Sequence, residues 1–446
     1  MSSETAFLSI EQLRTRYRDG SLTPLEVVSQ ALDRLDRMEP GLNAVAYKMA
    51  DHALAEANRL TTGLREGKDP GPLHGIPVAI KDLIDVRNVP TGFGSRIRAP
   101  VIADADAELV RRLREAGAII LCKSNLLEYA YGIAHPDIGQ TNNPHDVSRT
   151  SGGSSGGSAA LVAAGIVPLA IGTDTGGSIR IPAAYCGIVG IKPTFGLVPI
   201  DGVFPLSWTL DHAGPLCRSV ADTAVVLECI GARPIHLVPI SLNGLRIGII
   251  PHHFDDPVVT SGIAQSMRDV IDKLGEQGAT TTEIKIPDLA GINRELVNIL
   301  RPEAALIHAE LHAENAAGYA PATRSQIEAG FTVSAVHYVR AQRYRERMRA
   351  LVEAQFADVD VILSPSVPYV APHEDPEIAE DGGEGEMLAS GFANMTGHPS
   401  ISLPCGLSEN LPVGIQLTGG LGQDSRLLSI ALGIESTLDA YRRPSI

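Results

Sequence analysis

Residues 151–178 read SGGSSGGSAALVAAGIVPLAIGTDTGGS, and this stretch decides how the rest of the chain is interpreted. Two glycine–serine segments flank an expected small-residue helix over 158–164 and an expected strand over 166–171. Glycine beside serine brings backbone N–H groups and a hydroxyl close to a ligand, because no Cβ stands in the way. The stretch therefore predicts a ligand-binding centre inside the densest core pattern of the chain.

The second glycine–serine segment indicates acyl-transfer chemistry. Ser178 follows an apolar strand and a tight glycine turn, where the N–H groups of Thr175, Gly176, Gly177 and Ser178 converge. Such a turn is predicted to be an oxyanion hole, which stabilises the tetrahedral intermediate of acyl transfer. A serine hydroxyl needs a base to take its proton, yet none of the thirteen histidines lies between residues 146 and 211.

The first segment contains the pattern G-x-S-x-G at 152–156, the nucleophile elbow of α/β-hydrolases, which would make Ser154 the nucleophile. An elbow follows a buried strand, whereas the preceding residues 143–150 read NPHDVSRT and are polar. The strand precedes Ser178 instead. We therefore expect Ser178 to be the nucleophile and the elbow pattern to be accidental.

Lys81 is the base that the sequence offers in place of histidine. It ends the apolar stretch GIPVAIKD at 75–82, which is expected to be a buried strand. Burial lowers the pKa of a lysine and so allows it to accept a proton near neutral pH. Taken alone, Lys81 could be a surface lysine at a strand end. The sequence contexts of Lys81, Ser154 and Ser178 together favour a catalytic role.

Strands alternate with helices along most of the 446 residues, which predicts an α/β sheet covered by helices on both faces. Ser9 with Gln12, and Thr23 with Glu26, form expected capping boxes of two N-terminal helices. Asn125 is expected to cap a further helix. No repeat or linker divides the chain, so residues 1–446 are expected to be a single domain, with a less distinctive, helical, substrate-covering region at about 230–354.

Composition narrows the function classes. A chain that is 44% hydrophobic and 20% charged is globular, and its net charge of −15 argues against binding nucleic acid through phosphates. Its five cysteines lack C-x-x-C spacing and so predict neither a disulfide framework nor a zinc site. Without a secretory signal or a bilayer-spanning apolar run, we expect a soluble cytoplasmic protein that needs no metal.

Taken together, these motifs resemble the amidase signature family. The resemblance rests on GGSSGGSAA at 152–160, GTDTGGSIR at 172–180, PAAYCG at 182–187, GIKPT at 190–194, the lysine segment at 75–82 and the closing segment at 394–416. It covers nearly the whole chain and implies the amidase-signature fold, a large, mixed, twisted sheet. It also implies that Ser178 is the acyl-accepting nucleophile, that Lys81 is the base, and that Ser154, after a cis peptide bond from Gly153, relays the proton without metal or organic cofactor.

Further residues are expected around this triad. Gly153, Ser155, Asp174 and Arg180 are expected to support the two glycine turns, although a purely structural ion pair is the alternative for Asp174 and Arg180. By the same resemblance, the substrate pocket comes from variable segments. Its expected lining residues are Tyr129, Tyr131, Trp208, Ile307 and Tyr338.

The leading hypothesis is a free-standing amidase that acts on a small-molecule amide, away from membranes, with a homodimer compatible with the resemblance. Carbamates (urethanes), aryl amides or esters are alternative substrates for the same triad. The chain is also similar to the A subunit of glutamyl-tRNA amidotransferase, which releases ammonia from glutamine for a partner and would bring in a nucleic acid. Against that reading, Ser151 stands where that subunit usually carries proline, and the chain is somewhat short. The complete triad argues against a non-catalytic scaffold.

Overall fold

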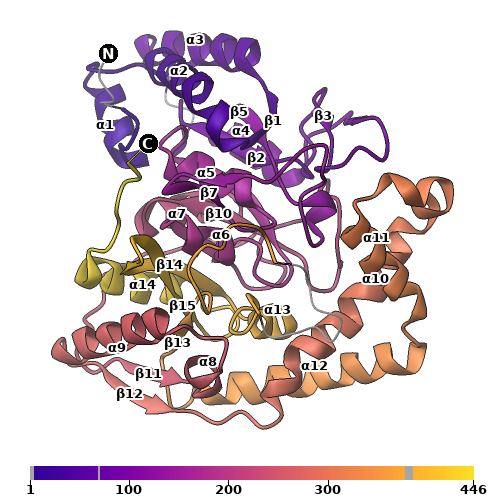
Figure 1. Cartoon of the computed structure of the whole chain (residues 1–446). Coiled ribbons are helices and arrows are strands. Elements are labelled where there is room, and N and C mark those ends of the chain that lie inside the picture. The colour runs from indigo at the N-terminus through magenta and orange to yellow at the C-terminus, as the bar shows by residue number, and fades with distance from the viewer. Residues whose placement is uncertain (1–4, 69–70, 377–384, 446) are drawn as a thin grey trace.

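An eleven-stranded mixed sheet runs through the part of the chain that the computed structural model describes, residues 5–68, 71–376 and 385–445 (Figure 1). In spatial order its strands are β1 (Val45–Lys48), β5 (Ile119–Ser124), β2 (Pro77–Lys81), β8 (Leu169–Asp174), β10 (His212–Cys217), β9 (Val189–Lys192), β14 (Ser400–Ser408), β15 (Leu411–Thr418), β13 (Val361–Pro365), β11 (Arg246–Ile249) and β12 (Thr280–Glu283). Strand β2 runs parallel to β5 and β8, and β11 runs parallel to β12 and β13, whereas the other pairs are antiparallel. The expected mixed α/β fold is confirmed.

Helices and short strands complete the fold (Figure 1). The α-helices are α1 (Ile10–Arg18), α2 (Pro24–Leu42), α3 (Ala50–Arg65), α4 (Glu108–Glu115), α5 (Gly156–Ala163), α6 (Arg180–Tyr185), α7 (Val220–Ile230), α8 (His252–Asp255), α9 (Ser261–Glu276), α10 (Ile292–Asn315), α11 (Pro321–Thr332), α12 (Ala335–Gln355), α13 (Gly391–Thr396) and α14 (Asp424–Leu438). The 3₁₀-helices are η1 (Glu128–Ala130), η2 (Leu289–Gly291) and η3 (Ala316–Gly318). The short strands β3 (Pro90–Thr91) and β4 (Val101–Ile102) pair with each other, as do β6 (Asn142–Asn143) and β7 (Asp146–Thr150).

The central strands are buried on both faces. In β2, Val78 and Ile80 belong to one core cluster and Ala79 belongs to another, because successive side chains of a strand point to opposite faces. Ala170 of β8 lies on the same face as Ala79. Small residues on that face make room for α5, whose residues are all buried. The glycine–serine segment that precedes α5 is thereby held against the sheet.

Local sequence signals account for the start of α2 and fail after β5. Both capping boxes are present, and Thr23 accepts a hydrogen bond from the backbone of Glu26 at the start of α2. The helix expected after Asn125 was wrong: residues 128–130 form a single 3₁₀ turn. Tyr129 and Ala130 have positive φ angles of 51° and 61°, which an α-helix does not allow.

None of the helices in the described ranges has both the length and the apolar character needed to cross a bilayer. Figure 1 shows α1–α3 at one end of the molecule, β11 and β12 at the other, and α10–α12 along one side. The lysine segment and the two glycine–serine segments lie between these parts, on β2, before α5 and after β8.

Candidate active site

Lys81 lies fully buried at the end of β2, where three hydroxyl groups surround its amine. Its Nζ atom is 2.7 Å from Ser154 Oγ, 2.9 Å from Ser155 Oγ and 2.8 Å from Thr173 Oγ1. The two serines come from the segment before α5, and Thr173 lies on the neighbouring strand β8. The parallel pairing of β2 with β8 brings these groups together.

The hydrogen bonds around Ser155 determine the direction of the bond between Lys81 and Ser155. Ser155 Oγ donates its proton to the carbonyl of Thr173 at 3.1 Å and accepts from the Thr173 N–H at 3.2 Å. Its single proton is committed, so Lys81 donates to Ser155. A neutral amine has two protons and one lone pair; if it gives those protons to Ser155 and Thr173, its lone pair faces Ser154. Ser154 is then the hydroxyl that can pass a proton to Lys81.

Burial also keeps part of the Lys81 population neutral near pH 7, which a proton acceptor needs. Desolvation lowers its pKa from the ordinary value of 10.5 to about 7, while the charges of Asp174 and Asp211 oppose the shift. A lysine with a pKa near 7 is partly neutral at physiological pH, and proton transfer is most efficient when the pKa lies near the working pH. The site therefore contains a lysine able to act as a general base.

The peptide bond between Gly153 and Ser154 is cis, as the family resemblance implied. Gly153 also has no room for a side chain, because a Cβ atom there would lie 2.1 Å from Leu127 Cδ1. The absence of a side chain lets the segment approach η1 closely and keeps Ser154 at 2% exposure beside Lys81.

Ser178 lies in the turn between β8 and α6, and its side chain is partly exposed. The carbonyl of Ser178 accepts a hydrogen bond of 3.2 Å from the Ser155 N–H, which joins the two glycine–serine segments. Within residues 5–68, 71–376 and 385–445, the N–H groups of Thr175, Gly176, Gly177 and Ser178 donate to no acceptor. Unpaired N–H groups beside a partly exposed hydroxyl are what an oxyanion hole requires.

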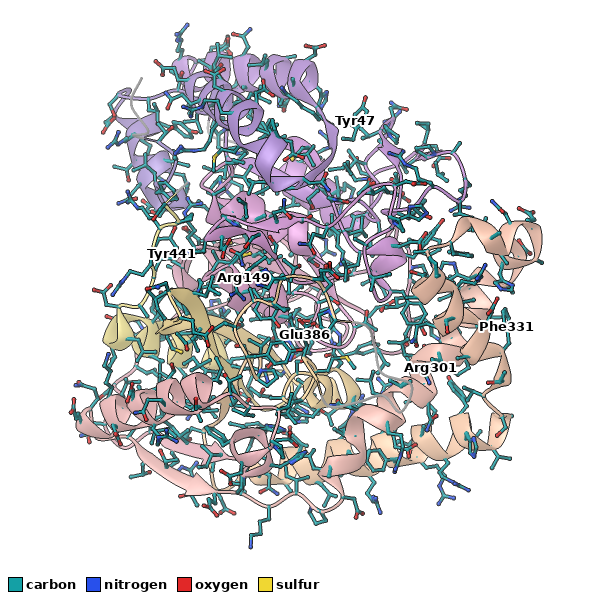
Figure 2. The ribbon with its side chains drawn as sticks, viewed as in Figure 1. Tyr47, Arg149, Arg301, Phe331, Glu386 and Tyr441 are labelled. Atoms are coloured by element: carbon teal, nitrogen blue, oxygen red, sulfur yellow. The ribbon has the colours of Figure 1, made fainter. Side chains whose placement is uncertain are left out.

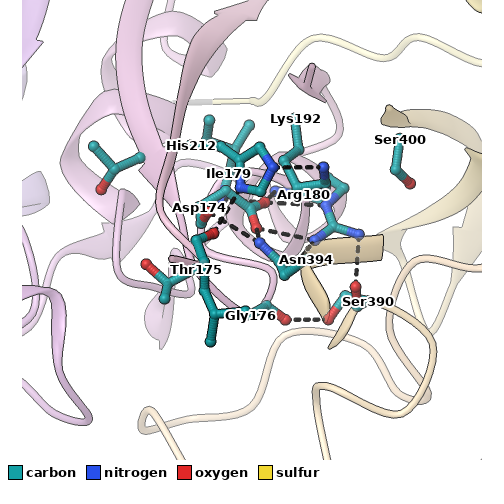
Figure 3. Close-up of polar contacts among 12 residues, drawn as sticks. Asp174, Thr175, Gly176, Ile179, Arg180, Lys192, His212, Ser390, Asn394 and Ser400 are labelled. Carbon is teal, nitrogen blue, oxygen red and sulfur yellow. Dashed lines mark hydrogen bonds and ion pairs between the residues drawn. The ribbon is translucent and has the colours of Figure 1, made fainter. Parts of the chain in front are cut away.

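Asp174 and Arg180 form a fully buried ion pair behind this turn (Figure 3). Arg180 Nη2 donates to Asp174 Oδ1 at 2.9 Å, and Asp174 Oδ2 accepts from the backbone N–H of Ile179 at 3.1 Å. Arg180 also donates to Asn394 Oδ1 at 2.6 Å and to Gln416 Oε1 at 2.7 Å. Burial alone would raise the pKa of Asp174, but Arg180 and Asn394 hold it well below its ordinary value. Neither charge of the pair is exposed to solvent, and both side chains bond to protein groups that surround the turn.

Replacing Arg180 with methionine is expected to lower the free energy of unfolding by about 3–5 kcal/mol, because the Asp174 charge would stay buried without its partner. The shift of the urea-denaturation midpoint measures this loss. The control is Arg347→Met, which removes an ion pair with Asp288 whose side chains are 55% and 63% exposed. That control should change stability by less than about 1 kcal/mol. Equal midpoints for the two variants would contradict a stabilising role of the buried pair.

The structure also places acidic residues near the site that the sequence did not single out. Asp211 accepts from Thr175 Oγ1 at 2.6 Å, and burial raises its pKa to about 7. Glu386, near the middle of the molecule in Figure 2, accepts from Tyr185 Oη at 2.6 Å, and burial raises its pKa to about 8. No local motif marks either residue, because each contacts the site through a partner that is far away in the sequence.

The five expected pocket residues lie in different surroundings. Tyr129 is buried in an aromatic cluster, stacked on Phe93 with ring centroids 5.2 Å apart. Tyr131 is also buried, under α11. Trp208 is 41% exposed and faces an outer depression that Arg345 also lines. Ile307 and Tyr338 are partly buried on α10 and α12. The five residues thus differ in burial and in the elements that carry them.

Comparison with known proteins agrees with this architecture. The family model described as Amidase matches residues 26–428. An amidase of Pseudomonas putida is 38% identical over 99% of this chain and 98% of its own length. The A subunit of the glutamyl-tRNA(Gln) amidotransferase of Symbiobacterium thermophilum is 34% identical over 98% of this chain and 99% of its own length. A solved amidase structure, 35% identical, superposes with a TM-score of 0.90 and covers 97% of this chain and 100% of its own.

Proposed function

The chain belongs to the amidase signature family and is an amide-hydrolysing enzyme, and from this premise we propose that it works alone, through an acyl-enzyme formed on Ser178. The observation that carries the proposal is the hydrogen bond of 2.7 Å between the buried Lys81 amine and Ser154 Oγ, beside a turn whose N–H groups meet no acceptor in the described part of the chain. Lysine is proposed as the base, Ser154 as the relay and Ser178 as the nucleophile.

In the proposed acylation step, Ser178 Oγ attacks the carbonyl carbon of the amide. Its proton passes to Ser154 Oγ as Ser154 gives its own proton to Lys81. The negative charge that develops on the carbonyl oxygen is stabilised by the N–H groups of residues 175–178. In this proposal the donors are oriented before the charge appears, so that no rearrangement is needed.

The protonated lysine then serves as the acid of the next step. A proton returns from Lys81 through Ser154 to the nitrogen of the substrate, and the C–N bond breaks. The amine leaves, and the acyl group stays bound to Ser178. Water attacks the acyl-enzyme by the same relay and releases the carboxylic acid. The cycle ends with Lys81 neutral and Ser178 free.

We further propose that the chain acts as one catalytic unit in which part of the region at 230–354 covers the substrate. Hydrogen bonds link its helices to the segment after β5. The Ala320 N–H, before α11, donates to Glu128 at 2.9 Å, and Thr323 Oγ1 donates to the Tyr131 carbonyl at 3.3 Å. These contacts set the position of α11 relative to the triad. All five cysteines are free, which suits the expected cytoplasmic location.

The similarity to the A subunits of amidotransferases makes ammonia release from glutamine the second candidate function. One local feature differs from the proline usual in those proteins. The Ser151 N–H donates to the Thr141 carbonyl at 2.9 Å, and Ser151 Oγ donates to the Asn142 carbonyl at 2.8 Å. Proline can make neither bond. This chain therefore fixes the entry to the Ser154 segment in its own way.

A substrate panel tests the proposal and separates the two candidates. The purified chain alone is incubated with aliphatic amides, aryl amides, carbamates, esters and glutamine, and the release of ammonia, amine or alcohol is measured. We expect hydrolysis of at least one amide class without a partner. Glutaminase activity that appears only after the partner proteins of an amidotransferase are added would overturn the free-standing reading and support the second candidate.

A further inference from the structure

Ser390, which directly precedes α13, contacts the turn that carries Ser178. Its Oγ atom donates to the carbonyl oxygen of Gly176 at 2.6 Å, and its side chain is fully buried. Figure 3 shows this contact on the side of the turn where Arg180 lies. The contact joins two segments that are more than two hundred residues apart in the sequence.

The geometry of a peptide bond explains why this contact matters. The carbonyl of Gly176 and the N–H of Gly177 belong to one planar trans peptide, so they point in opposite directions. A donor that holds the Gly176 carbonyl from behind therefore directs the Gly177 N–H away from α13. That N–H belongs to the proposed oxyanion hole.

Asn394 makes the equivalent contact with an earlier peptide of the same segment. Its Nδ2 atom donates to the Asp174 carbonyl at 3.0 Å, which fixes the peptide whose N–H belongs to Thr175. The same amide group donates to Asp174 Oδ1 at 2.8 Å. Ser390, the N-cap of α13, and Asn394 within the helix are four residues apart, so their side chains lie on the same side. A single helical turn thus contacts two peptides that present N–H groups to the substrate.

Hydrogen bonds to the two residues before α13 hold the start of this helix in place. Arg180 Nη1 donates to the Ser390 carbonyl at 3.0 Å, and Gln416 Nε2 donates to the Ala389 carbonyl at 2.5 Å. The approach is also sterically tight, because a Cβ atom on Gly177 would lie 2.6 Å from Ser390 Oγ. Ser390 therefore has a fixed position from which to orient the turn.

We infer that Ser390, supported by Asn394, is a positioning residue for catalysis that sets the direction of the oxyanion-hole N–H groups. The inference rests on the proposed roles of Ser178 and its turn. It adds that transition-state stabilisation depends on a hydroxyl that touches neither the substrate nor the lysine relay. Loss of that hydroxyl should affect the rate of acylation more than the binding of substrate.

The test compares Ser390→Ala with the matched control Ser400→Ala. Ser400 is equally buried, and its hydroxyl bonds to Thr418 Oγ1 at 2.9 Å, away from the turn in Figure 3. Both variants are assayed with 4-nitrophenyl acetate and with a fluorophosphonate that labels nucleophilic serines. Thermal midpoints are measured in parallel, because each variant loses one buried hydrogen bond.

For Ser390→Ala we expect kcat and the labelling rate to fall by roughly 10- to 100-fold, somewhat less than the loss of a whole oxyanion donor. KM, the thermal midpoint and the pH at half-maximal rate should stay close to those of Ser400→Ala. Equal kcat in the two variants, or a change confined to KM, would overturn the inference while wild-type labelling at Ser178 leaves the proposed function standing. A wild-type enzyme that is not labelled at Ser178 would overturn both.

Discussion

Replacing Ser178 with alanine is expected to reduce amide turnover by about 10⁴-fold or more, the scale on which removal of a catalytic nucleophile acts in serine hydrolases. The variant keeps the glycine turn, the free N–H groups and the Lys81–Ser154 contact, and lacks only the atom that accepts the acyl group. Substrate binding should persist. The measurement is the initial rate of amine or ammonia release on the best substrate of the panel, with fluorophosphonate labelling followed by mass spectrometry.

The matched control for this prediction is Ser158→Ala. Ser158 belongs to the same glycine-rich stretch, but it is fully buried within α5, where its hydroxyl bonds to Ser124 Oγ at 2.7 Å and to the Ile171 carbonyl at 3.1 Å. Its loss should cost some stability and little activity. If Ser178→Ala retained turnover and labelling moved to Ser154, the G-x-S-x-G reading of that serine would be correct instead.

Much of the active site was predictable because its signals are local. Lys81 ends an apolar strand, and Ser178 follows an apolar strand and two glycines, so each residue carries its own structural context in the sequence. Lys81 and Ser154 do lie together in the structure. Ser390, Asn394 and Asp211 have no such context, since each matters only through a segment that the fold brings alongside it.

The fold divides in the same way. Burial of the central strands β2 and β5 on both faces follows from their apolar runs, and α2 begins at a recognisable capping box. The spatial order of the eleven strands in the described chain depends on long-range pairing that no local pattern encodes. The failed helix after Asn125 shows tertiary packing overriding a local signal. There the ring of Tyr129 stacks on Phe93, and the positive φ of Tyr129 excludes an α-helix.

Replacing Lys81 with methionine is expected to lower kcat by about 10³-fold or more, because in the proposed relay Lys81 accepts the proton that Ser154 gives up. In the wild type, kcat/KM should rise with pH, reach half its maximum near pH 7 and level off above it, since only neutral Lys81 is a base and burial lowers its pKa to about 7. The profile is measured from pH 5 to 9. Glu386 also has its pKa shifted into this range, so Glu386→Gln, which should leave the inflection in place, is included as a control.

Asp211→Asn separates Lys81 from a second group in this range, because burial raises the pKa of Asp211 to about 7 as well. Its charge raises the pKa of Lys81, so Asp211→Asn should move the inflection to lower pH if the lysine is the titrating base. An unchanged midpoint in this variant would argue against Lys81.

The stability of the folded state gives an independent check on Lys81. A lysine whose pKa is lowered by folding destabilises the folded state below its unfolded pKa, most strongly below about pH 7, and this penalty fades as pH rises toward 10.5. Lys81→Met removes the penalty, so it should be inactive at pH 7 yet no less stable than the wild type, which would separate a functional lysine from a structural one.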